Sequence, residues 1–209
     1  MPSSQLIAIF PAARALARTA HAKDDATFEH GSRMIDASAA ICEALGCDPA
    51  AVEQLKIAAL LHDVGKCTVP DTILFKPSRL DAAEIQVMAD HSASGHNLLT
   101  EIGHPWFDVA ADVALMHHER HDGSGYPQGL AGDAIPVMAR IVAVADVYDA
   151  LRADRPYKTG ISHDEAMQVM TRGDERTRPS HFHPDALAAF VARSDIIRRI
   201  YAEHDNQPG

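Results

Sequence analysis

A histidine and an aspartate stand side by side at positions 62 and 63, directly after the apolar run 57–61. Burying such a pair is costly unless hydrogen-bonding partners or a metal ion compensate it. Gly65 and Lys66 follow, and one interpretation is a polar helix end with a glycine C-cap. The alternative is that Asp63 bridges metal ions and His62 binds one of them. The choice between the two depends on whether the chain supplies further ligands.

Five other residues of ligand type stand where helices are expected to end or to be buried, namely His30, His91, His117, His118 and Asp146. Asp146 follows the apolar run 141–145, and a carboxylate there needs an ion pair or a metal ion. For Asp149, one turn later, a structural hydrogen bond is the expected role. For His91 a hydrogen bond to a carbonyl group is the alternative, and for His30 a surface position in a first helical turn is equally compatible. The pattern of any one residue therefore decides little, and the set has to be weighed together.

As a set, five imidazoles and two carboxylates can complete the coordination of two octahedral ions if one carboxylate bridges them and water fills the remaining positions. Nitrogen and oxygen ligands without thiolate suit manganese, iron, cobalt, nickel or zinc. Two such ions about 3.5–4 Å apart activate a hydroxide and stabilise the entering and leaving oxygens of a phosphoryl displacement. The set therefore predicts hydrolysis of a phosphate ester.

The elements that must position these residues are helices. Strand-like alternation is nearly absent, whereas an apolar period of about 3.6 residues recurs along the chain. We expect an all-α bundle of about seven to nine helices. The expected helical segments are 5–20, 30–45, 49–61, 81–102, 105–116, 137–151, 162–172 and 185–203.

The segment 81–102 is expected to form one long helix that starts at a capping box of Asp81 and Glu84. Its predicted buried stripe consists of Ile85, Met88, His91, Gly95, Leu98 and Ile102. This stripe directs His91 toward the core, and Gly95 one turn later would allow a neighbouring element to approach closely. A buried histidine in this position needs a partner.

The composition describes a globular protein with one core, since 46% of its 209 residues are hydrophobic and 23% are charged. We expect an N-terminal helix in residues 1–20, a main domain in 21–200 and a disordered tail in 201–209. A net charge of −10 disfavours a nucleic-acid groove. The chain lacks an apolar run of about 18 residues and a basic leader, so we expect neither a membrane span nor a signal peptide.

The three cysteines, Cys42, Cys47 and Cys67, form no CxxC motif. Their odd number and spacing are typical of reduced thiols rather than of a disulfide framework or a zinc knot. We therefore expect a cytoplasmic protein.

Two motifs resemble those of a known family. His62-Asp63 with Gly65 and Lys66 resembles the HDxGK signature of HD-domain phosphohydrolases. Residues 117–127 match HHExxDGxGYP at every fixed position, and this block is similar to that of the HD-GYP family of bacterial cyclic di-GMP phosphodiesterases. The resemblance covers roughly residues 20–195 and includes His91-x3-Gly95, Asp146-x2-Asp149-Ala150 and Arg155-Pro156-Tyr157-Lys158.

The resemblance implies a helical domain of the HD type that hydrolyses cyclic di-GMP to linear pGpG and, in some members, to GMP. The implied mechanism is attack of a metal-bridging hydroxide on phosphorus. Two divalent ions are expected, iron or manganese before nickel, cobalt or zinc. Asp63 would bridge them, one ion being bound by His30, His62 and Asp146 and the other by His91, His117 and His118.

Substrate contacts are also implied by the resemblance. Lys66 would contact a substrate phosphate or the nucleophilic water, so Asp63 and Lys66 are the expected catalytic residues. Arg155 and Lys158 occupy positions where the family holds phosphate and base. Tyr126 would lie near the pocket, and in some relatives its loop, Gly123–Pro127, docks diguanylate cyclase (GGDEF) domains. The acid that protonates the leaving oxygen is left open between Glu119 and a water molecule.

The sequence departs from the family pattern at two places. Ala26 stands where three-metal members carry a glutamate, so we predict two ions rather than three. Near the C-terminus, Pro179 replaces a glycine, and Phe182-His183-Pro184 replaces Phe-Asp-Pro. We expect this segment to lie away from the metal ligands and the change to affect local packing only.

Two other functions are compatible with the sequence. One is a non-catalytic receptor for cyclic di-GMP or for a cyclase domain. The other is an HD phosphohydrolase that acts on a different cyclic or nucleoside phosphate.

Overall fold

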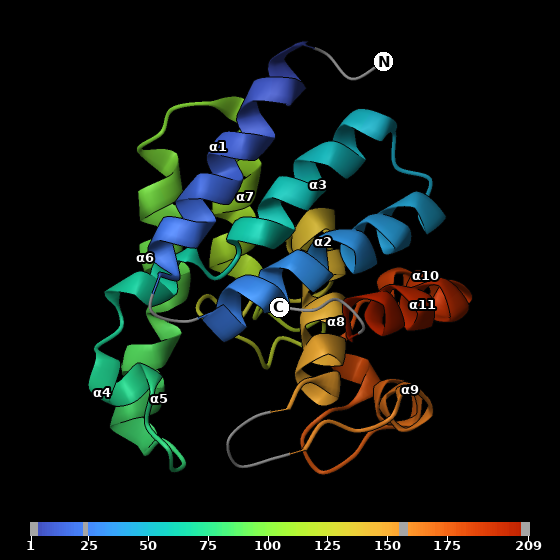
Figure 1. Ribbon diagram of the computed structural model, residues 1–209. Helices are drawn as coiled ribbons and strands as arrows, with labels where there is room; N and C mark the ends of the chain where they lie inside the picture. Colours follow the sequence, from blue (N-terminus) through green and yellow to red (C-terminus); the bar gives the residue numbers. More distant parts are fainter. Residues whose placement is uncertain (1–3, 23–24, 155–158, 206–209) are drawn as a thin grey trace.

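The computed structural model describes residues 4–22, 25–154 and 159–205, with side chains at all of these except 4–8, 25–27, 29 and 205 (Figure 1). The described residues contain helices and no strand, so the predicted all-α class is confirmed. In chain order the elements are α1 Ser4–Ala20, α2 Asp25–Ala44, α3 Pro49–Leu61, η1 Val64–Thr68, α4 Asp71–Leu74, α5 Ala82–Ala89, α6 His91–Thr100, α7 Pro105–Met116, η2 Gly132–Ala134, α8 Val137–Arg152, α9 His163–Arg172, η3 Pro179–His181, α10 Pro184–Ala192 and α11 Ser194–Asp205.

The described residues form eleven α-helices instead of the seven to nine expected. The stretch 81–102 is divided at Asp90 into α5 and α6, and the stretch 185–203 is divided at Arg193 into α10 and α11. The third addition is the single turn α4, in a segment that is not among the expected helices. The apolar period of 3.6 residues does not reveal such breaks, because two short consecutive helices can each have this period.

Local sequence determines where several helices start. The carboxylate of Asp48 accepts the backbone N–H of Ala51 at 2.9 Å, and Pro49 occupies the first turn of α3. The predicted capping box of Asp81 and Glu84 is present at the start of α5. These caps satisfy N–H groups that have no partner within the helix.

The centre of the molecule is formed by α2, α3, α7 and α8 (Figure 1). Figure 1 shows α2 and α3 side by side, with α4–α7 on one side of them and α9–α11 on the other. Helix α1 packs on α3 and contributes Ala13 and Ala17 to the same core. The segment expected as a separate N-terminal helix is thus part of the packed domain.

The predicted stripe of 81–102 is buried at His91 and Gly95, half-buried at Met88 and exposed at its other three positions. His91 is buried, but Ile85, Leu98 and Ile102 are 56%, 40% and 42% exposed. The covered face of α6 consists of His91, Ser92, Gly95 and Leu99, which meets α7 and η1. The break at Asp90 explains the error, because a single period cannot describe the faces of two helices.

Two glycines allow η1 to pass directly against α6. A Cβ atom on Gly65 would lie 2.0 Å from the carbonyl oxygen of His91, and one on Gly95 would lie 3.3 Å from the backbone nitrogen of Gly65. The close approach predicted at Gly95 is confirmed. Gly65 is not the C-cap of α3, since that helix ends at Leu61; its role is to bring Asp63 beside α6.

The expected disordered tail is wrong for its first residues. Helix α11 continues through Asp205, and the side chain of Tyr201 is buried. Residues 206–209 lie outside the described residues. Within the described ranges, the helices are too short or too polar to cross a membrane.

Candidate metal centre

The structure brings all seven predicted ligands together in two neighbouring groups, within each of which the ligand atoms lie within 4.8 Å of one another. The four-ligand group consists of Asp63, His91, His117 and His118. The three-ligand group consists of His30, His62 and Asp146. These residues come from α2, the end of α3, the start of α6, the end of α7 and the middle of α8.

Helix ends place most of these side chains. Buried apolar helices deliver His62 just after the end of α3 and His117 just after the end of α7. His91 is the first residue of α6. Because α3 packs against α7 and α6 packs against both α7 and η1, the three helix ends converge at one point.

Asp63 lies between the two groups and directs one oxygen toward each. Its Oδ1 atom is 3.3 Å from Nε2 of His91 and 3.8 Å from Nε2 of His117. Its Oδ2 atom is 3.4 Å from Nε2 of His62. This is the arrangement that a bridging carboxylate requires.

In the four-ligand group, backbone carbonyls determine which ring nitrogen carries the proton. Nδ1 of His91 donates to the carbonyl of Met88 at 2.7 Å, and Nδ1 of His117 donates to that of Ala114 at 3.0 Å. In the neutral form of each ring, Nε2 is then an acceptor, yet the two Nε2 atoms face each other at 3.4 Å. Two opposed lone pairs in a buried site require a cation between them.

The three-ligand group shows the same arrangement with a different partner. Nδ1 of His62 donates to the carbonyl of Ala59 at 2.7 Å, while Nδ1 of His30 donates to Oδ2 of Asp149 at 2.6 Å. The two Nε2 atoms are 3.2 Å apart, and Oδ1 of Asp146 lies 3.3 Å from Nε2 of His30. Hydrogen bonds of this kind to the second ring nitrogen orient histidines that bind metals.

Asp149 was predicted to make a structural hydrogen bond, and this is confirmed. In addition to His30, its carboxylate accepts Nε and Nη2 of Arg33 at 2.7 and 3.0 Å. Arg33 thus fixes the carboxylate that orients His30.

The carboxylates of both groups are ionised. Burial raises the pKa of Asp63, but the charges of Lys66 and His62 outweigh this effect and hold the pKa well below its usual range. Burial likewise raises the pKa of Asp146, and His30 reverses the shift. Anionic oxygen donors are therefore available at any pH near neutrality.

The imidazoles of the two groups differ in basicity. Burial lowers the pKa of His118 to about 4, and burial together with the neighbouring imidazoles holds the pKa of His117 well below its usual range. Burial also lowers the pKa of His30, but hydrogen bonds to Asp146 and Asp149 outweigh it and raise the pKa to about 9. A proton or a metal ion is thus strongly favoured beside His30. The donor set as a whole fits divalent transition-metal ions, because it combines neutral imidazoles with anionic carboxylates.

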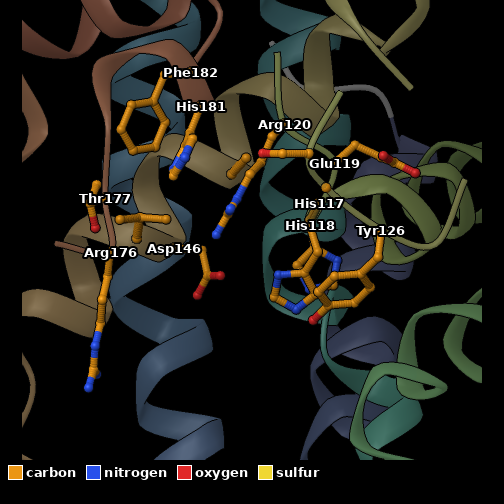
Figure 2. Close-up of a pocket in the computed structure, with 14 residues that line it drawn as sticks. His117, His118, Glu119, Arg120, Tyr126, Asp146, Arg176, Thr177, His181 and Phe182 are labelled. Atoms are coloured by element: carbon orange, nitrogen blue, oxygen red, sulfur yellow. The ribbon is translucent and has the colours of Figure 1, made fainter. Parts of the chain in front are cut away.

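A cavity of about 340 Å³ adjoins the two groups (Figure 2). Its lining includes three of the ligands, His117, His118 and Asp146. The other lining residues are Glu119, Arg120, Ser124, Gly125, Tyr126, Ala143, Val147, Arg176, Thr177, His181 and Phe182. Tyr126, predicted near the pocket, packs its ring against that of His118 with the centroids 4.7 Å apart.

The other predicted site residues have three different outcomes. The Nζ atom of Lys66 is 2.5 Å from Oδ2 of Asp63, so Lys66 lies beside the carboxylate between the two groups. Arg155 and Lys158 lie outside the described residues. Glu119 is buried, and its carboxylate accepts the backbone N–H groups of Gln128 at 2.7 Å and Leu130 at 2.9 Å. Its hydrogen bonds thus hold the loop that carries Tyr126, which argues against Glu119 as the acid for the leaving oxygen.

The expectation that the C-terminal segment lies away from the ligands is wrong. Arg176, Thr177, His181 and Phe182 line the same cavity as Asp146 (Figure 2). His183 replaces the usual aspartate without loss of the helix start, because its Nδ1 atom accepts the N–H of Asp185 at 3.3 Å.

Arg120 and Arg176 are lining residues that sequence reasoning did not single out. Their sequence signal was weak, because arginines outside a recognised motif are usually exposed surface residues. Arg120 stands within the block 117–127, but at one of its variable positions.

Comparisons with known proteins place these residues in a family context. The family model described as "HD domain" matches residues 14–179. The cyclic di-GMP phosphodiesterase response regulator RpfG of Xanthomonas campestris pathovar campestris is 45% identical over 155 residues, which are 74% of this chain and 41% of RpfG. A cyclic di-GMP phosphodiesterase of Thermotoga maritima is 36% identical over 88% of this chain and 49% of its own length.

A solved structure described as a cyclic GMP-AMP-specific phosphodiesterase of Vibrio cholerae superimposes with a TM-score of 0.56. Its sequence is 31% identical, and the match covers 94% of this chain and 42% of that chain. The chain therefore spans less than half the length of each of these relatives.

Proposed function

The chain belongs to the HD-domain family, and from this premise we propose that it is a metal-dependent phosphodiesterase of the HD-GYP type. Its proposed substrate is cyclic di-GMP, and its proposed products are linear pGpG and, after a second cleavage, GMP. We assign the activity to residues 21–200.

The observation that carries the proposal is the pair of opposed imidazole contacts. The Nε2 atom of His91 faces that of His117, and the Nε2 atom of His30 faces that of His62, at 3.2–3.4 Å. Each contact is unfavourable unless a proton or a metal ion lies between the rings, and Asp63 directs one oxygen toward each pair, as a ligand shared by two ions would. The arrangement supports two ions, with Asp63 shared, of which iron and manganese are proposed before nickel, cobalt and zinc.

Two bound divalent ions would supply an activated water and would neutralise charge on the phosphoryl oxygens. The chain's own residues prepare the site for this chemistry. His117 and His118 stay neutral at physiological pH, so they can bind without first releasing a proton. Lys66 is held at the bridging carboxylate, where its ammonium group can contact a phosphate oxygen or the attacking water.

The names of the relatives support a 3′,5′-linked cyclic dinucleotide as the substrate class. Two of them are called cyclic di-GMP phosphodiesterases, and the solved structure is called cyclic GMP-AMP-specific. The cavity of about 340 Å³ is within the usual range for small-ligand sites, roughly 300–1,000 Å³. We propose cyclic di-GMP rather than cyclic GMP-AMP because the curated relatives with this name include RpfG, which is 45% identical.

We also propose that Arg155 and Lys158 contact phosphate and base. The predicted absence of a third ion rests on Ala26, whose side chain lies outside the described part of the chain. Elemental analysis of freshly purified protein tests this prediction, and three ions per chain would contradict it. A cytoplasmic location is supported by three free thiols, those of Cys42, Cys47 and Cys67.

The Gly123–Pro127 loop supports a second candidate function, the docking of a diguanylate cyclase (GGDEF) domain. Tyr126 in this loop is 37% exposed, so a partner could reach it. A purely non-catalytic receptor is the less favoured form of this candidate, because such a protein has no need for two sets of opposed imidazoles.

The test is hydrolysis of cyclic di-GMP by protein reconstituted anaerobically with Fe(II) or Mn(II), with pGpG and GMP resolved by chromatography. Cyclic di-AMP and 3′3′-cyclic GMP-AMP serve as competing substrates in parallel reactions. We expect cleavage of cyclic di-GMP that is lost on chelation and restored by metal. Binding of cyclic di-GMP without cleavage under both metals would contradict the enzymatic proposal and favour the receptor.

A further inference from the structure

The wall of the cavity carries two arginines whose guanidinium groups have no anionic partner among the described residues. Arg120 is partly buried, and Figure 2 shows its side chain reaching into the space beside Asp146 and the His117–His118 pair. Arg176 lines the cavity from the C-terminal segment and is exposed. Two unpaired cations beside one cavity are unusual in a chain whose net charge is −10.

The position of this wall is fixed by hydrogen bonds. The carboxylate of Asp174 accepts the backbone N–H groups of Arg176 at 2.8 Å and of Thr177 at 2.6 Å. The N–H of His121 donates to the carbonyl of His181 at 2.9 Å, which ties the C-terminal segment to the residues after Arg120. The neighbouring Phe182 is buried in the core.

The charge of the proposed substrate requires such groups. A cyclic dinucleotide carries two phosphodiesters on opposite sides of its ring, each with one negative charge. Only one of them can lie on the metal centre at a time. Lys66 is already engaged by Asp63. Arg155 and Lys158, proposed above to contact phosphate and base, lie outside the described residues. Among the described residues that line the cavity, Arg120 and Arg176 are the arginines available to the second phosphodiester. Arginine suits this role, because its planar fork of N–H donors matches phosphate oxygens.

We propose that Arg120, assisted by Arg176, binds the phosphodiester that is not being cleaved. The inference rests on the proposed function, since it assumes a substrate with two phosphodiesters. Arg120 is the main contact because it is partly buried, where an ionic hydrogen bond is less screened by solvent than it is at Arg176.

The test compares Arg120→Met and Arg176→Ala with the control Arg178→Ala. Arg178 is exposed in the same segment but does not line the cavity. Steady-state kinetics of the Mn(II)-loaded variants are measured with cyclic di-GMP and with bis(p-nitrophenyl) phosphate, a diester that has a single phosphate. For Arg120→Met we expect KM for cyclic di-GMP to rise about tenfold, the typical effect of losing an ionic hydrogen bond. The loss in kcat/KM should be at least five times larger for the dinucleotide than for the simple diester.

Arg176→Ala should raise KM about twofold to fourfold, and Arg178→Ala should match the wild type. If Arg120→Met lowers kcat equally for both substrates, Arg120 acts on the scissile phosphate and the proposal is wrong. It is also wrong if Arg120→Met matches Arg178→Ala.

Equilibrium binding gives a readout that does not depend on turnover. Calorimetry on chelator-treated protein measures the affinity for cyclic di-GMP, cyclic di-AMP and 3′3′-cyclic GMP-AMP. A phosphate contact predicts that Arg120→Met weakens binding of all three by the same factor. A loss limited to the guanine-containing ligands would overturn the proposal in favour of base recognition. If wild-type protein binds a cyclic dinucleotide but does not cleave it, the proposed function fails, and these binding ratios still decide the role of Arg120.

Discussion

The two ligand groups on either side of Asp63 differ in that a carboxylate orients one histidine, His30, whereas backbone carbonyls orient His62, His91 and His117. In the four-ligand group, His91 and His117 are almost completely buried, and neutral backbone carbonyls accept their Nδ1–H groups. In the three-ligand group, His30 and Asp146 are 14% and 19% exposed, and the charged carboxylate of Asp149 accepts Nδ1–H of His30.

This difference determines how strongly protons compete with metal ions. Burial lowers the pKa values of His117 and His118, so both imidazoles remain unprotonated at neutral pH. A carboxylate makes the imidazole more basic, and the pKa of His30 is about 9. We therefore expect the four-ligand group to bind its ion with little pH dependence near neutrality. Binding in the three-ligand group should displace a proton and strengthen as the pH rises toward 9.

The largest expected effect removes what the two groups share. Asp63→Asn keeps the size of the side chain. It replaces the carboxylate, which directs one oxygen toward each ligand group, with a neutral amide. We expect bound metal to fall below one ion per chain, and kcat for cyclic di-GMP to fall at least about 1,000-fold, since metal ions contribute several kcal/mol to such reactions. Elemental analysis and product chromatography measure the two quantities.

The matched control for this variant is Asp112→Asn, on the exposed face of α7. It should retain wild-type metal content and turnover. Two ions per chain in Asp63→Asn would show that the groups do not depend on a common bridge.

The next largest expected effect is a loss of metal affinity in the three-ligand group alone. Asp149→Asn weakens the hydrogen bond that orients His30 and leaves His91 and His117 untouched. Substitutions of this kind typically reduce metal affinity about 10-fold to 100-fold. We expect that loss for one ion only, in a competition titration with a chromophoric chelator. Equal weakening of both ions would mean that the orienting partners are not specific to one group.

A smaller effect concerns the stability of the metal-free protein. The pKa of His30 is raised in the folded state from 6.5 to about 9, so its stabilising contribution is complete below pH 6.5 and is lost as the pH rises through 9. Between pH 7 and 9.5 we expect the free energy of unfolding to decrease by about 2 kcal/mol through this group. The carboxylates of Asp63, Asp146 and Asp149, whose pKa values are lowered, stay ionised over this range and contribute no change.

Urea denaturation of wild type and of His30→Gln at the two pH values measures this contribution. The pH-dependent difference should be present in the wild type and absent from the variant. If the two proteins respond alike, His30 does not carry the proton in the folded state.

The sequence predicted those features that depend on neighbouring residues. The caps at Asp48 and Asp81, the helix end at His62 and the buried position of His91 all follow from local pattern. The resemblance to the HD-GYP family then assigned the seven candidate ligands to two ions. All seven candidate ligands lie in the two groups, although their role in metal binding is still a prediction.

Contacts between distant segments could not be predicted in the same way. Asp149 was expected to make a hydrogen bond, but its partner His30 is 119 positions away, and no local pattern connects them. The segment that contains Pro179 and Phe182 was expected to lie away from the ligands, and no local pattern relates its residues to the cavity that several of them line. For Ile85 and Leu98, periodicity indicated an apolar face but not whether another helix covers it.

The most direct test of the central claim, that two ions held on either side of Asp63 act together, is a titration of metal-free protein with Mn(II) under anaerobic conditions. The rate of cyclic di-GMP hydrolysis and the metal bound per chain are measured at each step. We predict negligible hydrolysis up to one equivalent and a steep rise to full activity as the second ion binds. Full activity at one equivalent, or a requirement for a third, would contradict it.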